Sequence, residues 1–321
     1  MTSNTLVIVK RYPLNGDYHF TSMYEMMHSN YVIDYEGPIK LFTYLYSYTE
    51  VTRLFKFLEM AENAKFQLIY LCCNDCDLTK FISLPSTLRE LVCGKNKLKE
   101  LPDLPSQLRE LLCSQNKLIR LPLLPITLTR LNCDQNTIKS LPYLPEGLEI
   151  LSCVNNLIEE LPKLPNSLKT LNCSHNKIKQ LPKLPVSLKI LNCSCNELIF
   201  IPLLPSRIEL LKCNMNKVKL LPTNLPSTLT EIECSNNKLT DLPTSILTSG
   251  IKKINISNNP VFIKITGGYY YQYDVNITKI KQFIKKKAVK IIENWYLEIK
   301  YDPQYKFCQN RLNNEYNELF N

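Results

Sequence analysis

The feature that most constrains this chain is a twenty-residue segment that repeats from residue 68 to about residue 265. Residues 168–187, LKTLNCSHNKIKQLPKLPVS, give the clearest copy. So short a unit cannot bury an apolar core alone, and neighbouring copies must therefore stack into an elongated array. Ten copies begin with an apolar residue, at Leu68, Leu88, Leu108, Leu128, Leu148, Leu168, Leu188, Ile208, Leu229 and Ile251.

The first third of each copy, LxxLxC, predicts a short β-strand. Its fourth and sixth positions alternate with other residues and therefore face the same side of the strand. Successive copies then place their strands side by side and parallel. A residue that recurs at one inward position behaves as a small buried hydrophobe, and here it is cysteine. These cysteines are Cys73, Cys93, Cys113, Cys133, Cys153, Cys173, Cys193, Cys213 and Cys234.

The remainder of each copy predicts a turn and an extended return. A recurring asparagine is expected to stack as a buried ladder and to bind backbone groups that the turn leaves unpaired. Two prolines three residues apart in LPxLP exclude a regular helix and favour a polyproline-like path. The asparagines are Asn96, Asn116, Asn136, Asn156, Asn176, Asn196, Asn216, Asn237 and Asn259.

The pattern LxxLxCxxNxLxxLPxLPxx resembles the leucine-rich repeat. That resemblance implies an α/β solenoid, a horseshoe with a concave parallel β-sheet, an extended (polyproline-like) convex side and helical caps. Residues 68–259 are similar to the twenty-residue LPxLP repeats of secreted effectors of enteric bacteria. The composition, rich in Asn, Lys, Ile and Tyr, the cysteine ladder and the tail are similar to leucine-rich-repeat proteins of giant amoeba-infecting, mimivirus-like DNA viruses.

The repeats divide the chain into three parts. Residues 1–67 are predicted to form an N-terminal capping region, with a strand near 5–9 and a helix near 48–64. Residues 68–265 hold about ten leucine-rich repeats, and residues 266–321 form a C-terminal helical cap. Caps are expected because a solenoid otherwise exposes the apolar edges of its terminal repeats.

The C-terminal cap is expected to contain two helices. The first is capped by Asn276 or Thr278 and runs to about Ile299, and the second covers residues 304–320. The first is predicted to lay its apolar side on the last repeat, with its lysines in water. The alternatives for its lysine-rich part, residues 277–292, are a membrane-surface helix, a calmodulin-type target and a nuclear-localisation patch. The apolar side comprises Ile277, Ile280, Ile284, Val289, Ile291, Ile292 and Trp295.

The outward positions of the strands are the candidate binding surface. Positions three and five of each copy point away from the core and vary between copies. They read as apolar at the start, amide-rich in the middle and charged at the end, which suits a protein partner. The candidate residues are Tyr70, Glu90, Val92, Glu110, Leu112, Arg130, Asn132, Ile150, Ser152, Thr170, Asn172, Ile190, Asn192, Leu210, Lys212, Glu231 and Glu233.

A second stripe of basic residues follows the asparagine turn. The net charge of +10 is only mildly basic for 321 residues. We interpret the stripe as ordinary solubilising charge, with an acidic partner or a nucleic-acid backbone as the alternative. Aromatic residues for base stacking are nearly absent from this stripe, which disfavours nucleic acid as a partner. A membrane is disfavoured as well. The stripe comprises Lys97, Lys117, Lys177, Lys217 and Lys238, with Lys99, Arg120, Lys139, Lys179 and Lys219 nearby.

The sequence offers no constellation for catalysis, a cofactor or a metal ion. Cys73 and Cys76 have a metal-like spacing, but the repeat already accounts for both, and the chain has only three histidines. The ubiquitin-ligase domain of some bacterial effectors has no counterpart here, and Cys308 lacks the acidic partner of that domain. A cysteine ladder and the lack of a long apolar N-terminal run favour an intracellular, reducing compartment.

These observations predict a non-enzymatic interaction scaffold that binds a protein through its concave face. If the viral resemblance holds, the partner is a host-cell protein and the location is the host cytoplasm. One alternative is an adaptor whose N-terminal region docks ubiquitin-ligase machinery while the repeats hold a substrate. Another is binding of nucleic acid or membrane through a basic surface.

Overall fold

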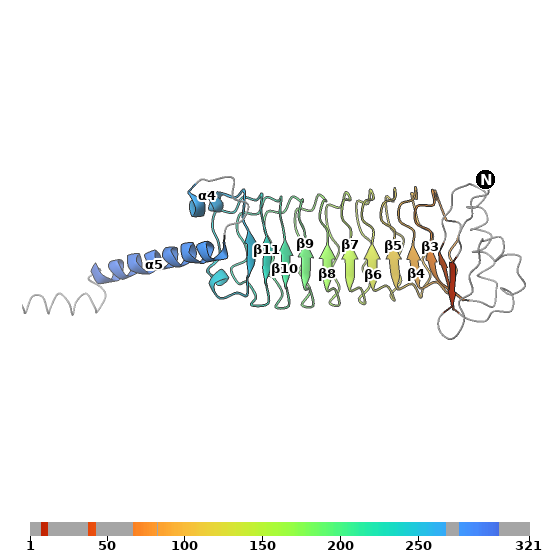
Figure 1. Cartoon of the computed structure of the whole chain (residues 1–321), viewed down its shortest axis with the longest axis horizontal. Helices are drawn as coiled ribbons and strands as arrows, with labels where there is room; N and C mark the ends of the chain where they lie inside the picture. The colour runs from red at the N-terminus through yellow and green to blue at the C-terminus, as the bar shows by residue number, and fades with distance from the viewer. Residues whose placement is uncertain (1–7, 12–37, 43–66, 82, 268–275, 302–321) are drawn as a thin grey trace, which may run out of the picture.

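The computed structural model describes residues 8–11, 38–42, 67–81, 83–267 and 276–301, which form a long, narrow solenoid (Figure 1). Its strands make one sheet of 12 strands in sequence order. The strands are β1 (Ile8–Arg11), β2 (Pro38–Phe42), β3 (Gln67–Cys72), β4 (Glu90–Val92), β5 (Glu110–Leu112), β6 (Arg130–Asn132), β7 (Ile150–Ser152), β8 (Thr170–Asn172), β9 (Ile190–Asn192), β10 (Leu210–Lys212), β11 (Glu231–Glu233) and β12 (Lys253–Asn255).

The ten strands from β3 to β12 fall one per repeat and pair in parallel, as the sequence predicts. Each pairing is a shift of one repeat, so that Leu131 lies beside Leu151 and Leu151 beside Leu171. At the first repeat, β2 pairs in parallel with β3, and β1 pairs antiparallel with β2. The sheet therefore extends beyond the repeats at its N-terminal end.

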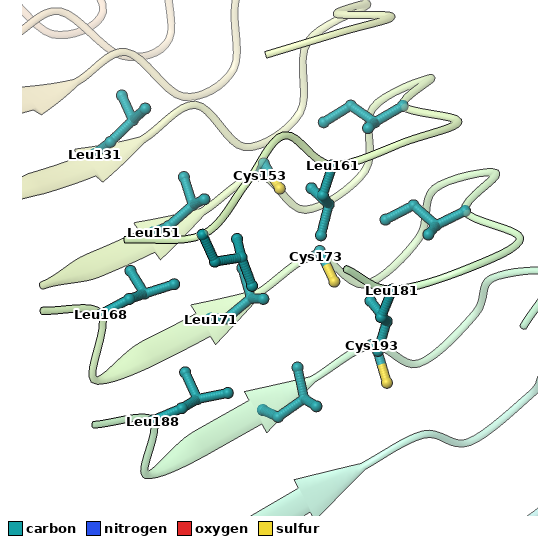
Figure 2. Packing of buried hydrophobic residues seen from close by; sticks show 14 of the residues in the cluster. Leu131, Leu151, Cys153, Leu161, Leu168, Leu171, Cys173, Leu181, Leu188 and Cys193 are labelled. Carbon is teal, nitrogen blue, oxygen red and sulfur yellow. The ribbon is translucent and has the colours of Figure 1, made fainter. Parts of the chain in front are cut away.

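Behind the sheet, the side chains of successive copies stack in rows (Figure 2). The leucine in the middle of each strand and the following cysteine are buried, as Leu171 and Cys173 show with exposed fractions of 0%. All nine ladder cysteines are buried and free. Several thiols reach a carbonyl of the next repeat, and Cys193 Sγ lies 3.4 Å from the Lys212 oxygen. The prediction that this cysteine replaces an apolar residue is confirmed.

The asparagine ladder is also confirmed. The Asn196 side-chain amide donates to the carbonyl oxygens of Cys173, Cys193 and Ser194 at 3.0, 3.1 and 3.2 Å. Its Oδ1 accepts the backbone N–H of Ile178 at 3.0 Å. One asparagine thus satisfies backbone groups of two repeats, which a turn cannot do for itself. The same contacts recur along the array.

The turn before each ladder asparagine has one residue in the left-handed region, such as Gln135 (φ 52°) and His175 (φ 56°). The following LPxLP segment is extended and ends in a tight turn, in which Leu168 N–H donates to the Pro165 oxygen at 3.2 Å. The extended return is therefore confirmed. The ninth repeat differs, because a 3₁₀-helix, η1 (Thr244–Leu247), replaces its second proline.

The tenth repeat ends in a short helix that the sequence reading missed, α4 (Pro260–Thr266). Proline suits the first turn of a helix because its missing N–H would have no partner there. Gly267, at φ 74°, ends the helix in the left-handed conformation. Seven residues are too few to show a helical period clearly, so the segment reads as the end of a repeat.

A long helix, α5 (Ile277–Tyr301), follows. It begins as predicted, because Asn276 Oδ1 accepts the Thr278 N–H at 2.8 Å. Ile280 and Ile284 are buried in the same cluster as residues of η1 and α4. The prediction that the apolar side packs on the last repeat is confirmed in part, for Ile280 and Ile284, because α5 runs past the end of the solenoid (Figure 1). The side chains left exposed are Val289, Ile291, Ile292 and Trp295.

Several expectations concern other parts of the chain. A strand near residues 5–9 is present as β1, shifted to Ile8–Arg11. The helix predicted near residues 48–64 and the second C-terminal helix at 304–320 lie outside the described residues, as does Cys308. Within the described residues, no helix is long and apolar enough to cross a membrane.

Candidate protein-interaction surface

The sheet face opposite the core brings together the candidate residues named above. In the three-residue strands they flank a buried central leucine, or isoleucine in β11, and these outer positions are half-buried or exposed. One row runs through Glu90, Glu110, Arg130, Ile150, Thr170, Ile190, Leu210 and Glu231, and Tyr70 precedes it. The second row runs through Val92, Leu112, Asn132, Ser152, Asn172, Asn192, Lys212 and Glu233. Their role in binding stays a prediction.

The centre of the first row is apolar. Ile150 and Ile190 expose 36% and 38% of their surface on either side of Thr170, and Leu210 continues the row. These isoleucines are not part of the core of the repeat, which lies on the other side of the sheet. Apolar residues at the centre of a polar face are typical of the core of a protein interface.

The second row presents hydrogen-bond donors. The Oδ1 atoms of Asn132, Asn172 and Asn192 accept the backbone N–H of the residue two positions later, at 3.0, 3.3 and 3.2 Å. The turn occupies the oxygen and leaves the N–H groups of each side-chain amide as the donors of this row. The middle of this face therefore offers N–H donors that match carbonyl or carboxylate acceptors.

The C-terminal end of the face is charged. Lys212 Nζ lies 3.0 Å from Glu233 Oε1, and Lys253 Nζ lies 2.7 Å from Glu231 Oε1. Burial favours a higher pKa for Glu233, but the hydrogen bonds from Lys212 and Asn214 outweigh it, and the pKa is below its usual value. Glu233 is therefore ionised at neutral pH. Asn214 was not predicted from the sequence as part of this face, and it donates to Glu233 at 3.1 Å.

At the other end, the face begins with Tyr70, Glu90 and Glu110. Burial, followed by nearby Cys72 and the two glutamates, raises the pKa of the Tyr70 hydroxyl, which therefore stays neutral at physiological pH. Arg130 Nη1 lies 3.9 Å from Glu110 Oε2, at the border of the apolar centre. Charged and polar groups therefore lie on both sides of Ile150 and Ile190.

The basic stripe past the asparagine turn is partly neutralised within the repeats. Lys97 Nζ lies 2.8 Å from Asp77 Oδ1, and Lys217 Nζ lies 2.9 Å from Glu197 Oε2. All four side chains are largely exposed, so these pairs contribute little to stability. The stripe carries mixed charge, as expected of a solvated surface.

The return side of the solenoid carries exposed apolar residues that the sequence analysis did not single out. Leu123 lies between the prolines of its LPxLP segment and exposes 84% of its surface. Ile126, Tyr143 and Leu203 are also exposed on return segments. Their position in LPxLP was readable from the sequence, because lysines stand at the same place in other repeats, at Lys163 and Lys183.

The Cys73 and Cys76 pair has the structural role that the repeat predicts. Cys73 is in the ladder, and Cys76 occupies the asparagine position, with its N–H donating to Asn96 Oδ1 at 3.0 Å. Burial raises the pKa of the Cys73 thiol well above its usual value, which opposes metal binding as a thiolate. Among the described residues, no group of three metal-ligating side chains is present.

Ten parallel strands, one per twenty-residue repeat, backed by cysteine and asparagine ladders, define a leucine-rich-repeat solenoid. Neither a protein-family model nor a curated protein matches the chain. Among solved structures, YopM from Yersinia enterocolitica WA-314 is 34% identical with a TM-score of 0.55, and the match covers 61% of this chain and 45% of that one. YopM from Yersinia pestis, a leucine-rich effector protein, is 32% identical with a TM-score of 0.50, over 60% of this chain and 61% of that one.

These likenesses relate the repeat array to that of bacterial effector proteins. They agree with the resemblance seen in the LPxLP segments and with the repeat length of twenty residues. The chain spans less than two thirds of the length of either YopM structure. The comparison therefore extends to the solenoid and to the class of protein–protein interaction scaffolds for which this fold is typical.

Proposed function

We propose that this chain is a non-enzymatic scaffold that binds a protein partner through the concave face of its sheet. The observation that carries the proposal is the apolar centre at Ile150 and Ile190, which polar and charged side chains border on both sides. This arrangement resembles a protein interface, with an apolar core inside a polar rim. The sheet holds these side chains at fixed spacing, so little conformational entropy is lost on binding.

The chemistry of the face indicates what the partner presents. Apolar side chains pack on the central row, and carbonyl or carboxylate groups accept from the amides of Asn132, Asn172 and Asn192. A folded surface or an extended peptide meets both requirements, since each combines apolar side chains with backbone carbonyls. A phosphate polymer offers hydrogen-bond acceptors but no apolar side chains.

We further propose that the partner is a host-cell protein and that binding occurs in a reducing compartment. The free, buried cysteine ladder supports the compartment. The compositional resemblance to viral leucine-rich-repeat proteins supports a host partner, as does similarity to a Yersinia pestis protein described as an effector. The adaptor alternative depends on residues 1–67, of which only β1, β2 and the start of β3 are described.

Affinity capture from an amoebal lysate tests this proposal. The bait is the full chain, compared with an Ile150→Glu/Ile190→Glu variant that places two charges in the apolar centre. A matched control, Leu123→Glu/Ile126→Glu, places the same charges on exposed return-side residues. We expect the first variant to lose the captured protein and the control to retain it.

Two results would contradict the assignment. Retention of the partner by the Ile150→Glu/Ile190→Glu variant, or its loss from the control alone, would move the interface to another surface. Loss of all capture after nuclease treatment or at moderate salt would indicate nucleic-acid binding instead. Neither variant replaces a side chain of the solenoid core, so both should remain folded, which circular dichroism checks.

A further inference from the structure

The apolar side of α5 divides into a covered half and an exposed half. Ile280 and Ile284 are 0% and 3% exposed where the helix packs on the last repeat. Ile291 and Trp295 continue the same helical face, since they follow at spacings of seven and four residues. They are each 59% exposed, because α5 extends beyond the repeats (Figure 1).

The exposed half carries a group of apolar side chains, interrupted by Glu293 and Glu298. Exposed apolar residues are common singly, but a cluster on one helix indicates a binding surface. Most of the set lies on an arc of the helix that adjoins the buried stripe. The exposed residues are Val289, Ile291, Ile292, Trp295, Tyr296 and Leu297.

The positive charge is concentrated in residues 277–292, which span the covered half and the start of the exposed half. Residues 277–292 include six lysines and no acidic residue. Lys287 forms an ion pair with Asp241 at the end of the solenoid, whereas Lys285 and Lys286 are exposed. The exposed apolar surface therefore begins directly beside a cluster of cationic side chains.

A second copy of α5 fits this surface poorly. Ile277, Ile284 and Ile291 are seven residues apart, as in one position of a coiled coil. In one heptad frame the other core position, three residues later, holds Lys287 and Asn294, and in the second frame, four residues later, it holds Lys281, Ala288 and Trp295. A paired seam would bury these polar groups and bring like charges together.

We propose that the outer half of α5 lies in the surface of an anionic lipid membrane. Ile291, Ile292 and Trp295 insert at the boundary between head groups and acyl chains, and the lysines contact acidic head groups. An amphipathic helix with lysines and a tryptophan has the composition of an interfacial helix. The helix is not apolar enough to cross the membrane, so it lies on the surface. The solenoid is thereby held at the membrane with its sheet face still open.

Trp295, the only tryptophan in the chain, provides a direct test. The full chain is titrated with vesicles of phosphatidylcholine containing phosphatidylserine, and with vesicles of phosphatidylcholine alone. We expect the tryptophan emission to shift to shorter wavelength and its quenching by acrylamide to fall with the acidic vesicles, and much less with the neutral ones. Unchanged emission, or equal binding to both vesicles, would overturn the proposal.

The proposal would also be overturned if Trp295 already emitted at short wavelength and were protected from acrylamide in buffer without vesicles. A dependence of that protection on protein concentration would identify a second copy as the occupant, and no dependence would identify another part of the chain. A shift caused by calcium-loaded calmodulin, with none caused by vesicles, would identify a protein partner for the helix instead.

Variants separate the two contributions to binding. Ile291→Glu should abolish vesicle co-sedimentation, and Lys285→Gln/Lys286→Gln should weaken it about fivefold for each lysine replaced. Leu123→Glu adds the same charge at an exposed return-side residue and should bind as the original chain does. Circular dichroism checks that each variant is folded. Undiminished sedimentation of folded Ile291→Glu would contradict the proposal.

Discussion

The two faces of the sheet differ in how much they vary from repeat to repeat. The inward position in the middle of the strand is leucine at Leu131, Leu151 and Leu171, and each is fully buried. The outward position just before it reads Arg130, Ile150 and Thr170 over the same three repeats. Positions one residue apart on the same strand therefore obey different constraints.

The difference has a physical cause. An inward side chain packs against identical neighbours in the repeats on both sides, so a change at one position disturbs three repeats. An outward side chain meets solvent and its two row neighbours only. The repeated positions therefore determine the fold, and the variable positions determine the binding chemistry. The following predictions test this separation, from the largest expected effect to the smallest.

The largest expected effect is a loss of stability at alkaline pH, caused by the cysteine ladder on the inward face. Burial raises the pKa of Cys173 and Cys213 to about 12, and that of the other ladder thiols well above the usual value. Thiols of the unfolded chain have a pKa of about 8.5, so the stabilising contribution of the buried thiols is fully present below that pH. Above it, each thiol removes about 1.4 kcal/mol of stability per pH unit until the folded pKa is reached.

Urea unfolding between pH 7.5 and 9.5 measures this effect. The free energy of unfolding should fall steeply across the upper half of the range because nine thiols contribute together. A Cys173→Ala variant should show a smaller slope, as one titrating group is removed. Constant stability to pH 9.5 would show that the ladder thiols are not protected by burial.

Truncation of an inward leucine should have the next largest effect. Leu191→Ala removes a fully buried side chain and leaves a cavity between repeats, which should cost about 2–5 kcal/mol. The matched change Ile190→Ala, one residue earlier on the outward face, should cost less than about 1 kcal/mol. Urea unfolding of both variants gives the comparison, and equal losses would contradict the separation of the two faces.

The asparagines offer a second matched pair. Asn196→Ala removes four ladder hydrogen bonds and leaves buried carbonyls and an N–H without partners, which should cost about 3 kcal/mol. Asn192→Ala, on the outward face, should cost about 1 kcal/mol, because only one hydrogen bond, from the Ser194 N–H, is lost. A similar loss for both would mean that the outward asparagines are structural as well.

The left-handed turn residues should give the smallest effect. Gln135 has a φ of 52°, a conformation that costs non-glycine residues about 1–2 kcal/mol and glycine very little. Gln135→Gly should therefore stabilise the chain by about 0.5 kcal/mol after the entropy loss of glycine. Gln135→Ala is the control and should be neutral. Destabilisation by glycine would show that this side chain has a structural contact.

The sequence predicted the interior of the solenoid well, because each repeated letter records the same packing many times. The Leu, Cys and Asn ladders and the extended LPxLP return all follow from that repetition. The left-handed turn residues were not anticipated, since they differ in type from Asp75 to Asn258. A backbone conformation that recurs in every repeat leaves no pattern in the sequence where many different side chains are tolerated.

The ends and the outer surface were predicted less completely. Helix α4 was missed because its seven residues are too short for a helical period. The apolar residues of α5 were correctly predicted. Which of them are covered depends on how far the helix extends past the last repeat, and the sequence pattern of the helix does not show this. The residues of the outward amide row were predicted. The hydrogen bonds that orient Asn132, Asn172 and Asn192 were not, because they depend on the geometry of the turn.

The most direct test of the concave face as the binding surface is site-specific photo-crosslinking. A benzophenone side chain replaces Ile190 in one version of the full chain and Leu123 in another, and each is irradiated with the captured partner. The account predicts a covalent adduct from position 190 and none from position 123. An adduct from position 123 alone would contradict it.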